Sequence, residues 1–319
     1  MKRSMLQLTA ALLCLALLSA CGGKTATSAP ADDTPESVTV TDDLGTVLTV
    51  TQTPARVVAL TGSFAETWLL AGGTLCATVD DAWDDFDLAL GEDVTNLGSS
   101  KRVSLEMLFD TEPDLVIASA NTSNHIELRD TLRQSGVETL YFDVSGFSDY
   151  LRMLSACTVL TGRADLYEQN GTAVQRRVDA AIQTAAEALK TQKAPRVLFL
   201  RAAASGVHAK GSEGTVLGEM LADLGCVNIA DGSSLLEDLS IEKIISEDPD
   251  RIFIVRQGDD AEAMERTLNE TLTGNPAWAG LSAVQEGRVH IMEKQLYHFK
   301  PNARWGEAYE QLASLLYGA

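Results

Sequence analysis

Short apolar runs alternate with helically spaced apolar residues through the first half of the chain. Buried-strand patterns occupy 57–60, 114–118 and 137–142, and helical patterns occupy 64–69 and 128–135 between them. A strand that is followed by a helix and a second strand indicates a right-handed βαβ unit with a parallel sheet. The first half is therefore expected to form an α/β lobe.

The second half repeats this alternation. Strands are expected at 196–200, 251–255 and 288–292, and helices at 216–224 and 239–246. Each half also contains a helix end, a Pro-Asp turn and a buried strand, at Pro113-Asp114 and at Pro249-Asp250. This internal similarity favours two related α/β lobes over one doubly wound sheet.

A long helical pattern from 165 to 190 separates the halves. Its apolar face has i, i+4, i+7, i+8 spacing and consists of Val174, Val178, Ala181, Ile182, Ala185 and Leu189. About 25 helical residues extend roughly 40 Å, enough to cross from one lobe to the other. Asn170-Gly171 weakens the first part and predicts a kink or break. The alternative is an ordinary packing helix inside one domain.

The first twenty residues have the character of a secretory signal. Lys2 and Arg3 precede an apolar run at 6–18, which is too short to span a bilayer comfortably. The ending Leu18-Ser19-Ala20-Cys21 resembles the bacterial lipobox, in which the cysteine, here Cys21, is lipidated and becomes the mature N-terminus. An ordinary signal peptide or an uncleaved anchor is the alternative. No later apolar run approaches 18 residues, so no transmembrane helix is expected.

The predicted organisation follows from these segments. It comprises a signal at 1–20, a flexible polar tether at 21–36, an N-terminal lobe at 37–163, a connecting helix at 164–192 and a C-terminal lobe at 193–319.

The net charge excludes one class of function, and the cysteine content indicates the state of the thiols. The 319 residues carry a formal net charge of −20, from 45 acidic and 25 basic side chains. A protein that binds the phosphate backbone of a nucleic acid would need the opposite balance. Cys76, Cys157 and Cys226 remain after the signal is removed. Single buried thiols are favoured, although one disulfide is possible.

Several motifs, in order along residues 50–319, carry a family resemblance. They are Pro54-Ala55-Arg56-Val57-Val58-Ala59-Leu60, Ser63-Phe64-Ala65-Glu66-Thr67, Pro113-Asp114-Leu115-Val116-Ile117, Thr215-x₃-Glu219-Met220-Leu221-x₂-Leu224-Gly225-x₂-Asn228, Pro249-Asp250 and Trp278-x₂-Leu281-x-Ala283-Val284-x₂-Gly287-Arg288-Val289. Together with the lipobox, they resemble the substrate-binding lipoproteins of bacterial ABC importers for ferric siderophores, haem and cobalamin. The resemblance implies an extracytoplasmic, lipid-anchored protein that captures a ferric siderophore between two lobes joined by a rigid helix. It also implies delivery to a permease dimer with its ATPase.

The resemblance further implies two acids that dock on arginines of the permease. By motif position these are Glu66 and Glu219. Both lie away from the apolar stripes of their helices, so both are expected to be exposed. Two separated carboxylates would fix the orientation of docking. The alternative is a pair of solvated helix glutamates.

Ligands of open α/β sheets bind beyond the carboxyl ends of the strands. The candidates at these positions and in the loop that follows 288–292 are Trp83, Asn121, Arg201, Arg256, Tyr297, His298, Lys300 and Arg304. We expect the three arginines and the lysine to form a basic cleft for an anionic chelate, with Trp83, Tyr297 and Trp305 as walls. Alternatively, Arg304 and Trp305 belong to a helix that packs the last segment.

Haem and cobalamin are the rival ligands. Haem needs an axial ligand such as His, Tyr or Met, and the available residues are His298, Tyr297, His208 and His125. His290 alternates inside a strand and is expected to be structural. Cobalamin would need an apolar, aromatic cleft. The four histidines lack the paired spacing of a dedicated zinc or manganese site, so no metal site and no cofactor are expected.

An enzymatic function is disfavoured. Ser240-Ile241-Glu242-Lys243 fits the S-x-x-K pattern of serine β-lactamases, but no K-T-G follows it. A cell-wall hydrolase is therefore a distant alternative, and the chain is expected to be a binding protein.

Overall fold

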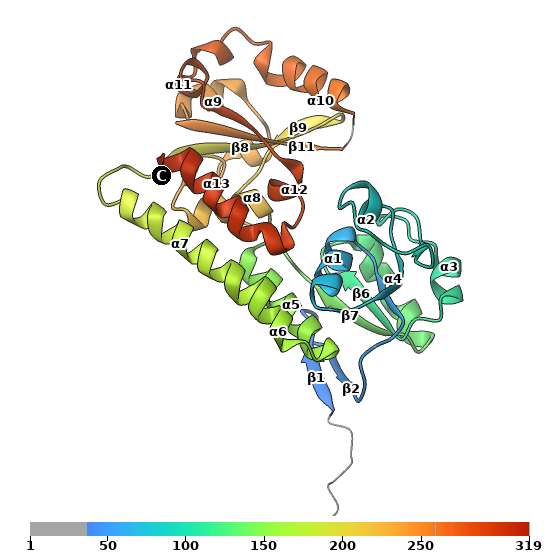
Figure 1. Ribbon diagram of the computed structural model, residues 1–319. Helices are drawn as coiled ribbons and strands as arrows, with labels where there is room; N and C mark the ends of the chain where they lie inside the picture. Colours follow the sequence, from blue (N-terminus) through green and yellow to red (C-terminus); the bar gives the residue numbers. More distant parts are fainter. Residues whose placement is uncertain (1–36, 259, 319) are drawn as a thin grey trace, which may run out of the picture. The chain divides into compact units, whose positions relative to one another are not determined.

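The computed structural model describes residues 37–258 and 260–318 (Figure 1). The predicted signal, Cys21 and the tether through residue 36 lie outside the described residues. Among the residues described, no helix combines the length and apolar character needed to cross a bilayer.

The first lobe contains a hairpin, a parallel sheet and helices. Its elements are β1 (Val38–Thr41), β2 (Val47–Val50), β3 (Val57–Ala59), α1 (Gly62–Leu70), β4 (Leu75–Thr78), α2 (Asp81–Asp84), β5 (Thr95–Asn96), α3 (Leu105–Asp110), β6 (Leu115–Ser119), α4 (Ser123–Gln134), β7 (Glu138–Phe142) and α5 (Phe147–Thr161). The sheet order is β5-β4-β3-β6-β7 and every pairing in it is parallel. β1 and β2 pair with each other in antiparallel fashion.

The second lobe is built in the same way. Its elements are β8 (Arg196–Ala203), β9 (Gly206–Ala209), α8 (Val216–Asp223), β10 (Val227–Asn228), η2 (Ser234–Leu236), α9 (Ile241–Glu247), β11 (Arg251–Gln257), α10 (Ala261–Leu268), η3 (Asn269–Thr273), η4 (Trp278–Gly280), α11 (Ser282–Gln285), β12 (Val289–Met292), α12 (Lys294–Tyr297), η5 (Asn302–Arg304) and α13 (Trp305–Tyr317). The parallel order is β10-β8-β11-β12, and β9 pairs with β8 in antiparallel fashion. The fold class predicted from the sequence, two α/β lobes with mainly parallel sheets, is confirmed.

The helix between the lobes is interrupted where the sequence predicts. It comprises α6 (Ala164–Tyr167), a π-helical turn η1 (Glu168–Thr172) and α7 (Ala173–Ala188). Asn170 Nδ2 donates to the Leu70 carbonyl at 2.8 Å, and the Tyr150 hydroxyl donates to the Asn170 carbonyl at 2.9 Å. First-lobe groups thus hold the π-helical turn, and α7 then packs along α13, as Figure 1 shows.

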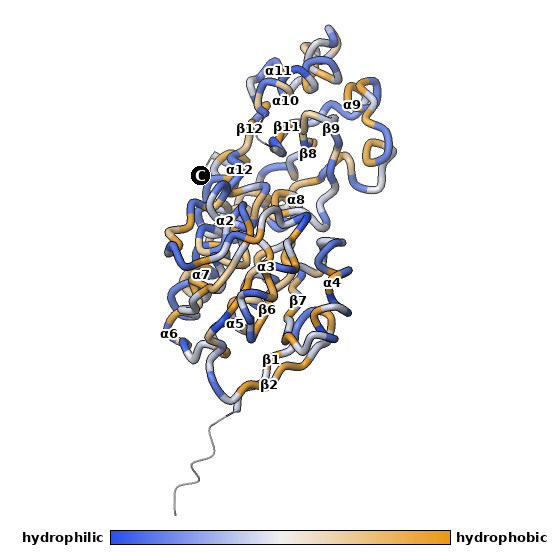
Figure 2. The backbone as a smooth tube through the Cα atoms, turned by 90° about the vertical axis from the view of Figure 1, so that its right-hand side faces the viewer, coloured by the Kyte–Doolittle hydropathy of each residue, from blue (hydrophilic) through white to orange (hydrophobic). Residues whose placement is uncertain are grey.

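Successive side chains on a strand point to opposite faces of the sheet, so the buried residues form separate clusters on the two faces. Val57 and Ala59 of β3 and Phe199 of β8 belong to one large cluster that also contains buried residues of α1, α5, α7, α8 and α13. The opposite faces of the two sheets form separate clusters, one in each lobe. β6 is buried along its whole length, and its hydrophobic colouring in Figure 2 agrees. Because it is covered on both faces, its sequence is continuously apolar.

The three cysteines of the described part, Cys76, Cys157 and Cys226, are free thiols. Cys157 is buried and the other two are partly buried. The thiols are single as predicted, but of the three only Cys157 is buried.

Candidate ligand-binding site

A segment of the second lobe, residues 294–302, contacts the first lobe just beyond the carboxyl end of β4. Lys294 Nζ forms an ion pair with Asp85 Oδ1 at 2.8 Å. The rings of Phe86 and Phe299 lie 5.3 Å apart between centroids, and Lys294 Nζ lies 4.8 Å from the centre of the Phe299 ring. These contacts bring the residues that follow β4 and those that follow β12 together, which is where α/β sheets bind ligands.

Gly62 makes the close approach of α1 and α2 possible. A Cβ atom at this position would lie 2.7 Å from Phe86 Cδ2 and 2.9 Å from the Ala82 Cα atom. The Gly62 amide instead donates to Asp81 Oδ1 at 2.8 Å. The position of α2, and with it the surface that meets Phe299, depends on this glycine.

Three basic residues of the second lobe gather at this place, and we call them the inter-lobe cation group: Arg201, His298 and Lys300. Burial, together with the charges of Arg201, Lys294 and Lys300, lowers the pKa of the His298 imidazole to about 4. Burial also lowers the pKa of Lys300 and of Arg201. Arg201 and Lys300 therefore place positive charge beside a neutral His298 in a partly desolvated site, within a protein of net charge −20.

Two nitrogen atoms of this group are buried without a hydrogen-bond partner among the described residues. They are Arg201 Nε and His298 Nδ1. A buried polar atom that lacks a partner costs about 1–3 kcal/mol. Most buried polar atoms in folded proteins have partners, so these two need a specific explanation. An anionic ligand that accepts hydrogen bonds would satisfy both.

Acids of the first lobe border the group. The carboxylates of Asp143 and Asp81 act on Lys300 in the direction opposite to burial. Asp143 Oδ1 accepts hydrogen bonds from the Asn121 side-chain amide and from the Ser145 hydroxyl. Asn121 thus lies at the border of the site, where its side chain contacts Asp143.

The structure brings some of the predicted ligand residues together and separates others. Arg201, His298 and Lys300 form the cation group, and Asn121 lies at its border. Trp83 is half-buried on α2, beside the acids of that helix, and packs against the large core cluster. The predicted basic cleft of four cations does not form, because Arg256 and Arg304 lie elsewhere.

Arg256 points to the other side of the second sheet. It lies opposite Ala202 in the β8–β11 register, whereas Val255 lies opposite Arg201. Since neighbouring residues on a strand point to opposite faces, Arg256 and Arg201 are separated by the sheet. Arg256 forms an ion pair with Glu265 of α10 at 3.3 Å.

Arg304 and Tyr297 also have partners of their own. Arg304 forms ion pairs with Glu307 at 2.8 Å and with Glu293 at 3.3 Å. Tyr297 is 3% exposed, and its hydroxyl donates to the Ala308 carbonyl. Trp305 is fully buried at the start of α13. The predicted ligand contacts of Tyr297 and the predicted Trp305 wall are wrong, because both rings are packed inside the protein. The packing helix is confirmed for Trp305.

The remaining histidines have different surroundings. His125 is fully buried, accepts from the Ser119 amide at Nδ1 and lies 2.9 Å from the Ser100 carbonyl at Nε2. His290 stacks on Phe253, which confirms its predicted structural role. His208 is exposed on β9, opposite Arg201. Across the described ranges, no group of three or more His, Cys, Asp or Glu residues is placed to hold a metal ion.

The two predicted docking acids are less exposed than expected. Glu66 is half-buried and accepts from Asn302 Nδ2 at 2.5 Å, and burial raises the pKa of its carboxyl. Glu219 is also half-buried and accepts from the Gly214 amide at 2.9 Å. Glu219 lines a cavity of about 450 Å³ together with Asp43, Asp143, Ser145, Asp149, Arg152 and Gly214. The prediction that both carboxylates are freely exposed is therefore wrong.

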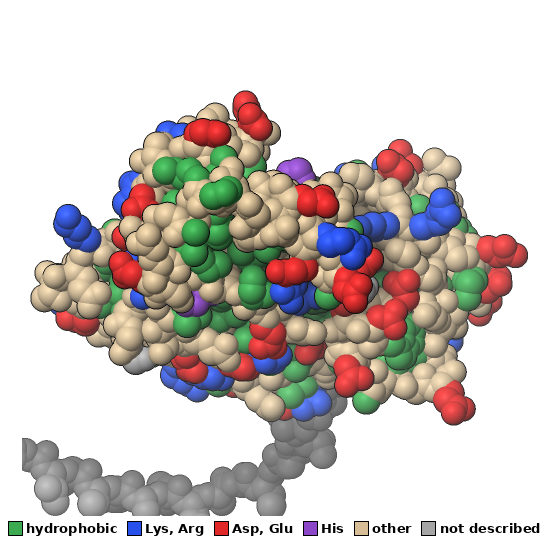
Figure 3. All heavy atoms as spheres, turned by 90° about the horizontal axis from the view of Figure 1, so that it is seen from above, with side chains coloured by type: hydrophobic (Ala, Val, Ile, Leu, Met, Phe, Trp, Pro, Cys, Tyr) green, Lys and Arg blue, Asp and Glu red, His purple; other side chains and the backbone are tan. Residues whose placement is uncertain are grey.

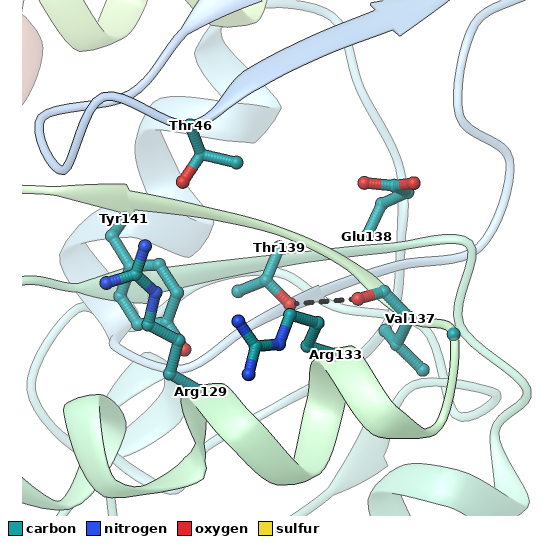
Figure 4. Close-up of a pocket in the computed structure, with 8 residues that line it drawn as sticks. Thr46, Arg129, Arg133, Val137, Glu138, Thr139 and Tyr141 are labelled. Carbon is teal, nitrogen blue, oxygen red and sulfur yellow. Dashed lines mark hydrogen bonds between the residues drawn. The ribbon is translucent and has the colours of Figure 1, made fainter.

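Two other features can be separated from the site. Figure 4 shows a smaller cavity of about 180 Å³, lined by α4 and β7, in which Arg129 lies beside Tyr141 and Arg133 lies near Thr139. The S-x-x-K sequence is a helix cap. Ser240 Oγ accepts from the Lys243 amide at 3.3 Å, while Lys243 Nζ pairs with Glu247 at 2.6 Å.

Five residues that connect the lobes were not among the predicted site residues: Asp85, Phe86, Lys294, Phe299 and Asn302. Asp85 and Phe86 follow β4 closely, so the strand-end rule could have identified them. Nothing in the sequence identifies the Lys294–Asp85 pair, whose members are 209 residues apart.

Two parallel sheets, an interrupted helix between them and a polar site at facing strand ends define a two-lobed binding protein. Residues 57–296 match the model of the periplasmic binding protein family, and the chain belongs to that family. The family predicted from the sequence is confirmed.

Relatives and solved structures agree with this assignment. The chain is 24% identical over 259 residues to the Fe(3+)-citrate-binding protein YfmC of Bacillus subtilis (strain 168), covering 78% of this chain and 76% of the relative. It is 26% identical over 283 residues to a cobalamin-binding protein of Halobacterium salinarum, covering 85% and 74%. A periplasmic heme binding protein from Pseudomonas aeruginosa has the same fold, with a TM-score of 0.67, 20% identity and coverage of 83% and 94%.

Proposed function

We propose that the protein captures an anionic ferric siderophore between its lobes and delivers it to an ABC importer. One observation carries the proposal: among the described residues, Arg201 Nε and His298 Nδ1 are buried without partners in a group of basic side chains between the lobes. A guanidinium and an imidazole N–H are donors suited to carboxylate or catecholate oxygens. The name of the Bacillus subtilis relative, a Fe(3+)-citrate-binding protein, supports an iron chelate as ligand.

The residues have separate roles in this proposal. Arg201, His298 and Lys300 bind the anionic oxygens of the chelate, and Asn121 and Trp83 lie at the border of the site. Glu66 and Glu219 dock on the permease dimer, which works with its ATPase. Lipid on Cys21 holds the protein outside the bacterial cell membrane.

Titration of the purified protein with ferric citrate tests the ligand. We expect binding to quench tryptophan fluorescence, because Trp83 is half-buried on the helix that borders the site. Citrate without iron is the control for the chelate. Failure of ferric citrate and of a panel of catecholate and carboxylate siderophores to bind would refute the proposed ligand class.

Haem is the second candidate, and one observation favours it. His298 has an unpaired Nδ1, and its pKa of about 4 keeps the ring neutral at pH 7, as an axial ligand of iron must be. Haemin titration should then produce a Soret band that is lost in His298→Ala. Cobalamin completes the ligand panel, since a relative carries that name. It is less favoured because the site is charged.

Charge reversal tests docking. Glu66→Lys together with Glu219→Lys should abolish uptake into cells, while the purified variant still binds its ligand with an affinity reduced by no more than about tenfold. Normal uptake by the double variant would contradict the assignment of both acids.

A further inference from the structure

Asn302 connects the second lobe to helix α1 of the first. Its side chain is 1% exposed, and Nδ2 donates to the Ser63 carbonyl at 2.9 Å and to Glu66 Oε2 at 2.5 Å. Oδ1 accepts from the Thr67 hydroxyl at 3.2 Å. Both N–H donors and the carbonyl acceptor of the Asn302 side chain are therefore paired with residues of one helix, α1 of the first lobe.

The backbone at Asn302 suits this role. Its φ angle is +51°, in the left-handed region that asparagine tolerates better than most other residues with a side chain. Pro301 precedes it and fixes the approach of the chain. This conformation directs the Asn302 side-chain amide toward α1. Asn302 is also the first residue of η5, which α13 follows directly.

The ligand-facing loop lies just before this residue. His298 and Lys300 stand four and two residues ahead of Asn302. Upstream, the segment is held by the Lys294–Asp85 ion pair, and between His298 and Lys300 the Phe299 ring packs against Phe86. The loop is thus attached to the first lobe at both ends, and its geometry depends on those attachments.

Of the three partners of Asn302, Glu66 is the one that an external partner can occupy. Ser63 and Thr67 are buried, whereas Glu66 is half-buried. A guanidinium that binds a carboxylate in bidentate fashion uses both of its oxygens. Such a partner would therefore compete with Asn302 for Glu66 Oε2.

We propose that Asn302 is a positioning residue that couples Glu66 to the ligand-facing loop. When a cationic partner engages the Glu66 carboxylate, Asn302 Nδ2 loses an acceptor, the loop at 298–300 loosens and the ligand is held less tightly. The inference rests on the proposed function in one respect, since it takes Glu66 as the docking acid. It adds a route by which docking promotes release. By linkage, bound ligand and bound partner would then weaken each other.

Hydrogen exchange of the ligand-free full chain tests the coupling directly. Glu66→Ala removes the acceptor, and we expect amides in 297–303 to exchange about tenfold faster, the effect of losing one such hydrogen bond. Glu66→Gln keeps a carbonyl acceptor and should exchange like the wild type. Glu310→Ala, which removes an ion pair of α13 with Arg177 but no contact of Asn302, is the matched control.

A second variant approaches the contact from the other side. Asn302→Asp replaces the donor to Glu66 with a carboxylate and should accelerate exchange of the same segment at least as much. Equal exchange of Glu66→Ala and wild type would overturn the proposal. So would equal acceleration by Glu310→Ala.

Ligand dissociation separates this inference from the proposed function. With ferric citrate as probe, Glu66→Ala should release the ligand about tenfold faster than wild type or Glu66→Gln, in line with the loss of one hydrogen bond. If the wild type binds no chelate but exchange responds as expected, the proposed ligand fails and the coupling stands. If chelate binds and neither exchange nor release responds to Glu66→Ala, the coupling fails and the proposed ligand stands.

Discussion

Asp81 provides a quantitative test of the site, because its carboxyl is half-buried and interacts with Gly62 of α1 and with Lys300 of the ligand-facing loop. Burial raises its pKa from 3.8 to about 6, and the neighbouring charges of Asp80 and Asp85 act in the same direction. The Gly62 amide and the charge of Lys300 oppose the shift. The folded protein therefore binds a proton at Asp81 more tightly than the unfolded chain does.

The sign of the pH dependence follows from this difference. The contribution of a carboxyl whose pKa is raised by folding is fully present below pH 3.8 and is lost as the pH rises through about 6. At 1.36 kcal/mol per pH unit, ionised Asp81 reduces the free energy of unfolding by at most about 3 kcal/mol at pH 7.5.

Asp81→Asn removes the titration and keeps an oxygen that accepts from Gly62. Urea unfolding should show the variant gaining up to about 3 kcal/mol over wild type between pH 4 and pH 7.5. Asp84→Asn, an exposed residue of the same helix, is the control for a lost surface charge. If the stabilities of Asp81→Asn and wild type change in parallel over this range, the reasoning about burial at Asp81 is refuted.

Three further predictions follow from single contacts. Arg201→Gln should weaken ferric citrate binding at least about tenfold in a fluorescence titration, whereas Arg256→Gln, on the opposite face of the sheet, should leave it unchanged. Tyr150→Phe removes the hydroxyl that donates to the Asn170 carbonyl, and urea unfolding should show a loss of about 1–2 kcal/mol without a change in ligand affinity. Ser240→Ala should cost about 1 kcal/mol as a lost helix cap, and an unchanged midpoint in thermal unfolding would contradict that role.

The parallel strands could be predicted because burial on both faces leaves a direct signal. Residues 115–118 of one strand and 252–255 of another are continuously apolar, and both strands follow Pro-Asp turns. The π-helical turn at Glu168–Thr172 was also foreseeable, since Asn170-Gly171 is a poor helix sequence. What holds the turn was not foreseeable, because Leu70 and Tyr150 approach it only in the folded chain.

Two elements that were not predicted, the β1–β2 hairpin and helix α5, have recognisable patterns in the sequence. Residues 38–41 read Val-Thr-Val-Thr, and the Asp43-Leu44-Gly45 turn that follows is typical of a hairpin. Helix α5 has buried residues at helical spacing, among them Phe147, Tyr150 and Leu154. Both patterns are local, so neither element requires tertiary information to be predicted.

The error over the basic cleft has a different origin. The strand-end rule predicts which end of a sheet binds a ligand, but it does not say toward which face a side chain points. Arg201 and Arg256 both lie near the carboxyl ends of adjacent strands. Only the register, with Arg201 opposite Val255, shows that they occupy opposite faces. Register depends on packing between strands, which the sequence of either strand alone does not contain.

The distribution of ion pairs separates the arginines that pair with surface acids from Arg201, which the proposed ligand contacts. Figure 3 shows basic side chains beside acidic ones on the face seen from above, and exposed arginines such as Arg133, Arg177 and Arg304 have carboxylate partners. Exposed pairs of this kind contribute little to stability. Arg201 is different, because its Nε is buried without a partner among the described residues, although the chain has 45 acidic side chains. Retaining an unsatisfied donor at the lobe interface destabilises the unliganded protein. A binding site can offset that cost when the ligand supplies the missing acceptor, so the unpaired Arg201 Nε argues for an anionic ligand more strongly than the net charge does.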